Sequence, residues 1–336
     1  NVGVRVVSLA SPQRTNIALV AANGPETPHP NTAAVPIVAV VSAEGVAARC
    51  RILVRAGERV LGRTDSFDVA ADEQREVELR LPPLPIGTHA LTVELEPADW
   101  MTSDQTRFVA LEVAPPPVVW LATANADDTS ALVLRNLLAP EVLPAEEQLV
   151  ALRVLDALSA KELEAGSPRP SLLIVLSGTT LDEATATRVR AHMQDGGTVL
   201  LVPAAADVEP DWPGLRPLIS ADAPELETLT ARTALRWRPT SSYADLPELE
   251  DFVRCSIRRR VRFIELADEV RVEAECADGA PALLSRDVGA GRLLVLATAP
   301  DPAWSDLGIR AAGLLTWLHY VIAEAGDRPR AVASFA

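Results

Sequence analysis

The residues best suited to chemistry are three cysteines and four histidines, and their spacing limits what they can do. Cys50, Cys255 and Cys276 form no Cys-x-x-Cys pair, so neither a zinc site nor a dense disulfide framework is expected. Two alternatives remain, a single disulfide between Cys255 and Cys276 or three inert thiols in a core. The histidines are widely separated: His29, His89, His192 and His319. Without a His-x-x-x-His pair or a phosphate-binding glycine loop, the sequence predicts no metal and no cofactor.

Two groups of polar residues follow apolar runs that are typical of buried strands. Asp127 and Asp128 come after the run at 118–121, and Ser177 and Thr179 come after a second such run. In parallel sheets, ligands bind where the carboxyl ends of the strands meet. These four side chains are therefore candidate contacts for a polar ligand. The alternative is helix capping and loop hydrogen bonding, which Asp, Ser and Thr also favour.

A dense basic patch occurs in this acidic chain. Arg258, Arg259 and Arg260 are consecutive, and two more arginines lie within four residues of them. The patch predicts internal pairing with Asp and Glu, a docking site for an acidic partner, or a solvated face. Trp212, in the turn-rich stretch Pro-Asp-Trp-Pro-Gly, is a further candidate contact because binding residues concentrate on loops.

Composition excludes several classes of function. The 336 residues include 46 acidic and 31 basic side chains, which gives a formal net charge of −15. Nucleic acids and anionic membrane surfaces bind cationic proteins, so neither is an expected partner. No run approaches the roughly 18 apolar residues that a membrane-spanning helix needs. The length predicts two or three domains.

The residues up to 114 predict an immunoglobulin-like β-sandwich. Short runs with alternating apolar and polar residues are separated by turn residues, at 2–9, 16–22, 35–41, 48–54, 76–81, 89–96 and 107–113. About seven such strands in roughly 110 residues are typical of this fold. Ala-Pro-Pro-Pro at 114–117 then predicts a stiff linker.

The residues from 115 to 327 predict a second domain of α/β type. Fully apolar runs alternate with amphipathic segments, which favours a mostly parallel sheet flanked by helices. The pattern becomes irregular at about 205–290, where we expect a β-rich insertion. Its runs at 261–266, 270–276 and 282–286 predict antiparallel strands, either an extension of the sheet or a small subdomain. Residues 328–336 are expected to form a C-terminal tail.

Several stretches carry a resemblance to a known family. They are Glu96–Val113 at the end of the sandwich, Asp278–Leu284 (DGAPALL), Gly289–Leu296 (GAGRLLVL) and Asp301–Arg310 (DPAWSDLGIR). In this order they resemble the extramembrane part of BatA-like bacterial membrane proteins, which begin with an aerotolerance-type region of two membrane spans. The resemblance implies a CARDB-like immunoglobulin domain followed by a flavodoxin-like domain of the class I glutamine-amidotransferase kind.

The catalytic pattern of amidotransferases is absent from this chain. Those enzymes place a nucleophilic Cys on a turn between a strand and a helix. Here the apolar run at 198–202 continues as Pro203-Ala-Ala-Ala, and no His follows in the stretch 297–301. We therefore expect a protein that is not an enzyme.

The resemblance then implies a protein-binding or scaffolding ectodomain on the periplasmic side of a bacterial inner membrane. Its implied partners are other envelope proteins, such as von Willebrand A-domain proteins of a MoxR-associated system. The chain begins Asn-Val, and we expect it to be a piece of a longer protein whose membrane segment is absent here. The alternatives are an amidotransferase- or hydrolase-type enzyme with a displaced nucleophile, and an α/β domain that binds a small ligand.

Overall fold

The computed structural model describes residues 16–97, 101–144, 147–164, 169–204, 212 and 214–327. The chain divides into two compact units, one of residues up to 116 with 145–147 and one of 117–144 with the residues from 148 onward. No helix among the described residues is long and apolar enough to cross a membrane. The strand expected at 2–9 and the tail expected at 328–336 lie outside the described residues.

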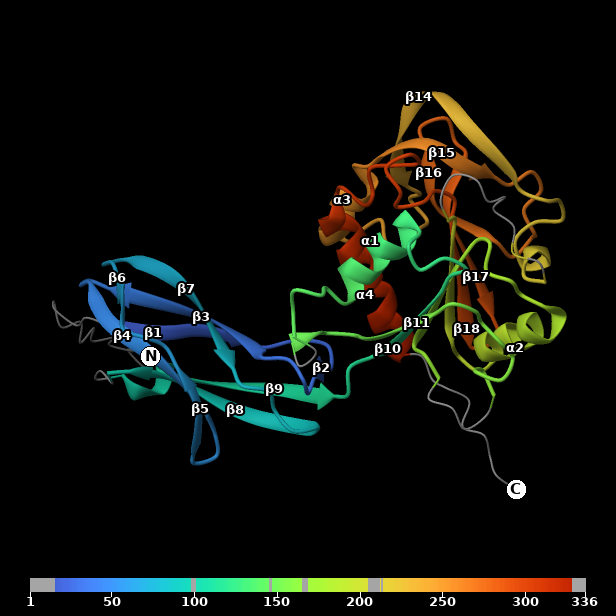
Figure 1. Ribbon diagram of the computed structural model, residues 1–336. Helices are drawn as coiled ribbons and strands as arrows, with labels where there is room; N and C mark the ends of the chain where they lie inside the picture. Colours follow the sequence, from blue (N-terminus) through green and yellow to red (C-terminus); the bar gives the residue numbers. More distant parts are fainter. Residues whose placement is uncertain are drawn as a thin grey trace, which may run out of the picture. The chain divides into compact units, whose positions relative to one another are not determined.

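The first unit consists of two β-sheets (Figure 1). One is antiparallel and contains, in order, β1 (Asn16–Asn23), β3 (Val35–Glu44) and β7 (Glu73–Leu81). The other contains, in order, β2 (His29–Pro30), β9 (Thr106–Ala114), β8 (Gly87–Glu96), β4 (Ala48–Ala56) and β5 (Arg59–Arg63). The short β6 (Phe67–Val69) also pairs with β4, and a 3-10 helix, η1 (Thr102–Asp104), precedes β9.

Alternation of side chains along the strands creates the core between these two sheets. In β3, Val35, Ile37, Ala39 and Val41 are buried while the residues between them are only half-buried. Side chains two residues apart point to the same face of a strand, so one face of each sheet is removed from water. The predicted immunoglobulin-like β-sandwich is confirmed for this unit.

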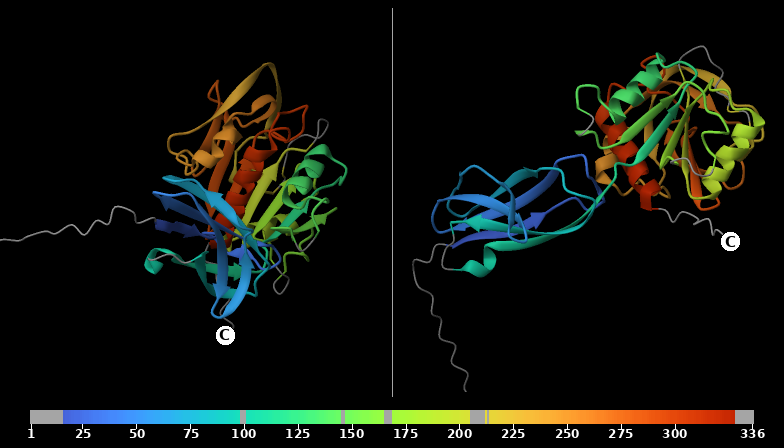
Figure 2. Two further views of the ribbon diagram at one scale, coloured as in Figure 1. Left: turned by 90° about the vertical axis from the view of Figure 1, so that its left-hand side faces the viewer. Right: turned by 60° about the horizontal axis from the view of Figure 1, so that its bottom comes forward.

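The second unit is built on one sheet of nine strands. Its order is β11 (Ala151–Leu155), β10 (Val118–Ala122), β12 (Leu172–Leu176), β13 (Thr198–Val202), β18 (Gly291–Leu296), β17 (Pro281–Val288), β16 (Arg271–Cys276), β14 (Glu225–Trp237) and β15 (Ser256–Arg262). The helices are α1 (Thr129–Leu138), α2 (Glu183–Gln194), α3 (Glu250–Val253) and α4 (Ala311–Asp327), with two 3-10 helices, η3 (Arg216–Leu218) and η4 (Pro247–Leu249). α1 and α4 cover one face of the parallel strands and α2 covers the other (Figure 2).

The predicted flavodoxin-like or glutamine-amidotransferase-like sheet, mostly parallel and flanked by helices, is wrong. Four neighbouring pairs in the sheet are parallel and four are antiparallel. The chain is 44% strand and only 17% helix. Of the two alternatives for the segment at about 205–290, its four strands β14 to β17 form an extension of this same sheet rather than a separate subdomain.

The reason for this error is that an apolar run indicates burial but not which strand lies beside it in the sheet. β17 and β18 are both rich in buried apolar residues, yet only Gly289 and Ala290 connect them. A two-residue turn permits only an antiparallel hairpin. Gly289 has φ +63°, and a Cβ built on it would lie 2.6 Å from the Gln194 Cα, so a glycine is required there.

The antiparallel end of the sheet curves into a half-barrel. The free side of β15 bonds to the segment after β18, with Val261 N donating to Ala297 O at 2.6 Å. Arg258 N likewise donates to Trp304 O at 2.7 Å. These bonds protect what would otherwise be an exposed edge strand.

Candidate functional site

The four polar residues predicted at strand ends lie where parallel β10 and β12 finish. Asp128 is the N-cap of α1, and its Oδ1 accepts hydrogen bonds from Ser130 N at 2.9 Å and Ala131 N at 3.3 Å. Asp127 has an exposed side chain, and its main-chain N–H donates to Asn125 Oδ1 at 3.0 Å. Asp128 therefore satisfies main-chain donors that the first turn of a helix leaves without partners.

Ser177 and Thr179 connect the loops that follow neighbouring strands. Ser177 Oγ accepts a hydrogen bond from Ala204 N at 2.8 Å, which joins the ends of β12 and β13. Thr179 Oγ1 donates to Ala122 O at 3.2 Å, which joins the loop after β12 to the end of β10. Both side chains are buried. Their hydrogen bonds stabilise the sheet edge, and their contact with a ligand stays a prediction.

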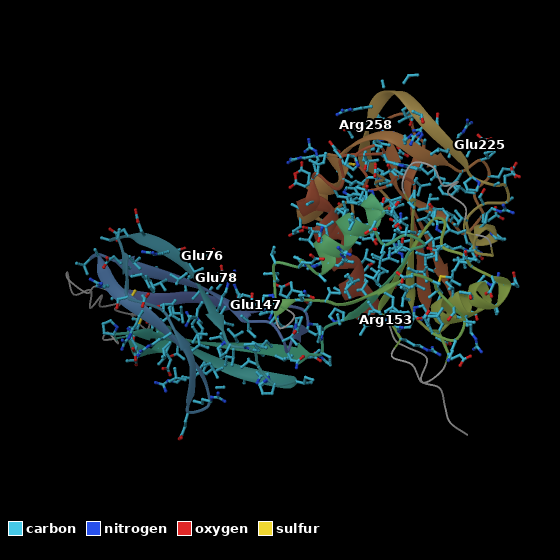
Figure 3. All side chains as sticks on the ribbon, viewed as in Figure 1. Glu76, Glu78, Glu147, Arg153, Glu225 and Arg258 are labelled. Atoms are coloured by element: carbon cyan, nitrogen blue, oxygen red, sulfur yellow. The ribbon has the colours of Figure 1, made fainter. Side chains whose placement is uncertain are left out.

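The three consecutive arginines of β15 have three different environments. Arg260 is buried, with its guanidinium bound to both carboxylate oxygens of Asp278 at 2.8 and 2.7 Å and to Glu227 at 2.8 Å. These bonds hold the pKa of Asp278 below its usual range. Arg258, labelled in Figure 3, donates to the Pro302 carbonyl oxygen, and Arg259 donates to a threonine hydroxyl. The charge of Arg260 is thus balanced inside the unit rather than presented to a partner.

Trp212 lies in the core rather than on a binding surface. It is 1% exposed and belongs to the apolar cluster on the α2 side of the sheet, with Val189, Leu215 and Val261. Burying an indole removes a large apolar area from water, which is enough to draw a loop residue inward.

The cysteines are free and buried. Cys276 pairs with Leu235 on one side of β14, while Ser256, the residue after Cys255, pairs with Ala234 on the other side. Two strand spacings separate the two cysteines by about 10 Å, beyond the roughly 7 Å limit between Cα atoms in a disulfide. The alternative of a Cys255–Cys276 disulfide is therefore wrong for this structure.

The thiols are also poorly suited to nucleophilic chemistry. Burial raises the pKa of Cys50 to about 11 and that of Cys255 to about 12, and it raises the pKa of Cys276 as well. A nucleophilic cysteine needs a lowered pKa, because the thiolate is the reactive form. In the described ranges there is also no group of three or more His, Cys, Asp or Glu side chains able to hold a metal ion.

A buried ion pair ties α4 to the sheet. Arg292 of β18 donates to Glu273 Oε1 at 2.9 Å, and the two side chains are only 6% and 4% exposed. Arg292 also donates to Glu324 of α4 at 3.2 Å and to the Tyr243 hydroxyl at 3.3 Å. Ser285 donates to the same Glu273 carboxylate. The cluster joins α4 to three strands of the sheet, and Arg292 and Glu273 are almost excluded from water, which favours a structural role.

The first unit has two hollows that the sequence reasoning missed. One, of about 600 Å³, lies at an end of the second sheet between the start of β4, the end of β8 and residues 102–106. The available signal was the arginine-rich stretch of β4 and β5, with five arginines at 49, 51, 55, 59 and 63. Because Arg49, Arg51 and Arg55 are spaced by even numbers, they share the outer face of β4.

The second hollow, of about 520 Å³, runs beside β7. On one side it is lined by residues 64–67 and on the other by Arg75–Arg80 of β7. Glu76 and Glu78 lie along this strand (Figure 3) and are exposed. β7 pairs only with β3 among the described strands, so its other edge has no ladder partner there.

Comparison with known proteins gives similarity to solved structures only. No protein-family model matches the chain, and no curated protein matches it. A CARDB domain from Pyrococcus furiosus, in complex with di-metal ions, is 9% identical with a TM-score of 0.26, covering 30% of this chain and 89% of that domain. A β-galactosidase from Rahnella sp. R3 is 16% identical with a TM-score of 0.41, covering 66% of this chain and 32% of the enzyme. A cytoplasmic protein from Salmonella typhimurium LT2 is 10% identical with a TM-score of 0.39, covering 62% of this chain and 96% of that one. The chain thus spans about a third of the β-galactosidase's length.

Proposed function

We propose that this chain is a non-catalytic protein-binding module that holds an extended segment of a partner protein against β7. The observation that carries the proposal is the open edge of β7 with a hollow of about 520 Å³ beside it. An edge strand offers a row of main-chain donors and acceptors, and an added strand from another protein satisfies them.

The side chains along β7 define the chemistry of the partner. Gln74, Glu76, Glu78 and Arg80 share the outer face of the strand, opposite Ser42, Val40, Val38 and Pro36 of β3. Arg80 donates to Glu78 at 2.9 Å, whereas Glu76 has no ion-pair partner among the residues described. An extended segment with a basic side chain opposite Glu76 is complementary to these charges on β7. The same charges discourage indiscriminate pairing of the edge.

The resemblance to BatA-like extramembrane regions supports a setting for this binding. We place the protein, as part of the same proposal, in an envelope assembly on the periplasmic side of a bacterial inner membrane, held there by a segment outside this chain. Its partners in that setting are other envelope proteins, including von Willebrand A-domain proteins of a MoxR-associated system. The immunoglobulin-like sandwich supports this proposal because such domains commonly present their edges and loops to partners.

Site-specific photo-crosslinking in the source cells tests the proposal. A photoreactive residue at position 76 of the full-length protein is expected to capture one partner, whereas the same residue at Glu112, exposed on β9 of the other sheet, is not. The purified partner should then lose at least about tenfold in affinity for Glu76→Lys but not for Glu112→Lys, because opposite charges across an interface set specificity. Equal capture at both positions, or equal affinity of both variants, contradicts the proposal.

A further inference from the structure

We propose that the hollow at the end of the second sheet, here called the Gln105 hollow, is a binding site for a carboxylate group. It shares Ser66 with the second hollow, which runs beside β7, but no residue of β7 lines it. The inference therefore goes beyond the strand-binding function proposed above and stands on different residues.

Gln105 supplies the first observation. Its side chain is 4% exposed and lines the hollow, and its Nε2 has no hydrogen-bond partner among the described residues. The main-chain oxygen of Gln105 accepts from Leu95 N at 2.9 Å, so the backbone fixes the residue where it is. A buried amide donor without a partner costs about 1–3 kcal/mol. We expect such an unpaired donor where a ligand supplies the missing acceptor.

The charges around the hollow supply the second observation. Glu96 is paired with Arg51 at 2.6 Å and Glu94 with Arg55 at 3.0 Å, so both carboxylates are already neutralised. Arg49 also lines the hollow and has no ion pair in the part of the chain that the structure describes. The charges of the four charged lining residues sum to zero. Arg49 is the one among them without an ion pair to a described residue, and Asp68 lies across from it on β6.

The floor of the hollow adds no negative charge. Cys50 lies there, 2% exposed, and burial keeps its thiol protonated at neutral pH by raising its pKa to about 11. The hydroxyls of Ser66, Thr102 and Thr106 also line the site. Hydroxyls can donate as well as accept, so they fit an anion beside the two dedicated donors.

These groups select the class of ligand. An amide N–H and a guanidinium both donate, and a carboxylate accepts with two oxygens while it balances the charge of Arg49. A cationic ligand is disfavoured by the same arginine. The carboxylate has two sources, a small organic acid or an acidic side chain of a peptide, and the experiment below separates them.

The test follows the side-chain amide signal of Gln105 by ¹H–¹⁵N NMR in the full chain, with Gln105→Leu used to assign it. Acetate, acetamide and a triglutamate peptide are titrated separately. Acetate should shift the signal and acetamide, which has the same shape without the charge, should not. If triglutamate binds and acetate does not, the source is a peptide; in either case the site takes a carboxylate.

Two arginine variants complete the test. Arg49→Ala is expected to weaken binding by about tenfold, because it removes a charge-assisted hydrogen bond. Arg63→Ala removes an arginine that is also exposed but lies outside the hollow, and it should change binding less than about twofold. Equal shifts with acetate and acetamide, or equal weakening in both variants, overturns the proposal. Capture at position 76 is independent of these results, so the failure of either proposal can be told from failure of the other.

Discussion

Polar side chains lie close together at two places in the molecule. At one place they bond to the main chain, and at the other some of them have no partner among the described residues. At the carboxyl ends of β10 and β12, the side chains of Asp128, Ser177 and Thr179 all bond to main-chain groups. In the Gln105 hollow, the Gln105 amide nitrogen and the Arg49 guanidinium have no such partners among the described residues. A polar residue is available to a ligand only where the fold has not already used its donors and acceptors.

The difference follows from what each location demands. The start of α1 and the loops after parallel strands contain main-chain N–H groups without ladder partners, so nearby side chains are drawn to them. At the end of the sandwich, the main-chain oxygen of Gln105 is already paired with β8. Its side-chain amide nitrogen has no main-chain acceptor nearby and stays without a hydrogen-bond partner among the described residues.

The comparison is tested most severely at Arg292, whose buried guanidinium is paired with Glu273 and Glu324. Arg292→Met leaves the Glu273 carboxylate buried without its cation, and removing one partner of such a pair costs about 3–5 kcal/mol. Urea unfolding followed by tryptophan fluorescence measures this in the second unit, which holds five of the six tryptophans. The matched control is Arg271→Met, whose pair with Asp287 is exposed on both sides and contributes no more than about 1 kcal/mol. Equal losses in the two variants would contradict the comparison.

The three consecutive arginines offer the next largest effect. Arg260→Ala removes three charge-assisted hydrogen bonds and should lower the free energy of unfolding by about 2 kcal/mol. Arg258→Ala should cost no more than about 0.5 kcal/mol, because its bond to a carbonyl oxygen is exposed.

Acidic pH should reduce the difference between Arg260→Ala and the wild type. The hydrogen bonds from Arg260 lower the pKa of Asp278 in the folded state. The resulting stability is present above the unfolded pKa of about 3.9 and is lost as the pH falls through the folded pKa. Urea titrations at several pH values check this. If the difference in free energy of unfolding between the two proteins grew below pH ~4, the ion pair with Asp278 would not be the source of the stability that Arg260 supplies.

The sequence predicts the sandwich well and the second sheet only in part. Alternation such as Val35, Ile37, Ala39 and Val41 determines which face of a strand is buried, and this is a local property. The antiparallel strands expected at 270–276 and 282–286 are β16 and β17. Their place in the same sheet as the parallel strands is not local, because it depends on connections such as the turn at Gly289. An all-apolar run fits a parallel and an antiparallel neighbour equally well.

The candidate sites differ in the same way. Capping by Asp128 is one of the two alternatives that the residues themselves predict, because its partners are two and three residues away. Gln105 has no such local signal. Its burial and its unmet amide result from packing against residues 49–51 and 94–97, which are distant in the sequence. The burial of Trp212 was missed for the same reason.

Asp128→Ala should have a smaller effect than Arg292→Met or Arg260→Ala. Loss of the N-cap of α1 is expected to cost about 1 kcal/mol, and Asp127→Ala, next to it but exposed, should cost less than about 0.5 kcal/mol. Urea unfolding of the two variants measures both values. If the two aspartates proved equivalent, the capping role would be wrong and a ligand role for the pair would regain support.

The smallest effect should have the opposite sign. Gln105→Met keeps the length of the side chain and removes a buried amide nitrogen that has no hydrogen-bond acceptor among the described residues, so the first unit should become more stable by about 0.5–1 kcal/mol. Hydrogen exchange of β8 and β9 amides, measured by mass spectrometry, reports the first unit separately from the second. The same variant should bind acetate more weakly than the wild type. If Gln105→Met is more stable and binds acetate more weakly, the amide serves the ligand and not the fold. If Gln105→Met is less stable, the amide stabilises the fold, as the side chain of Asp128 does.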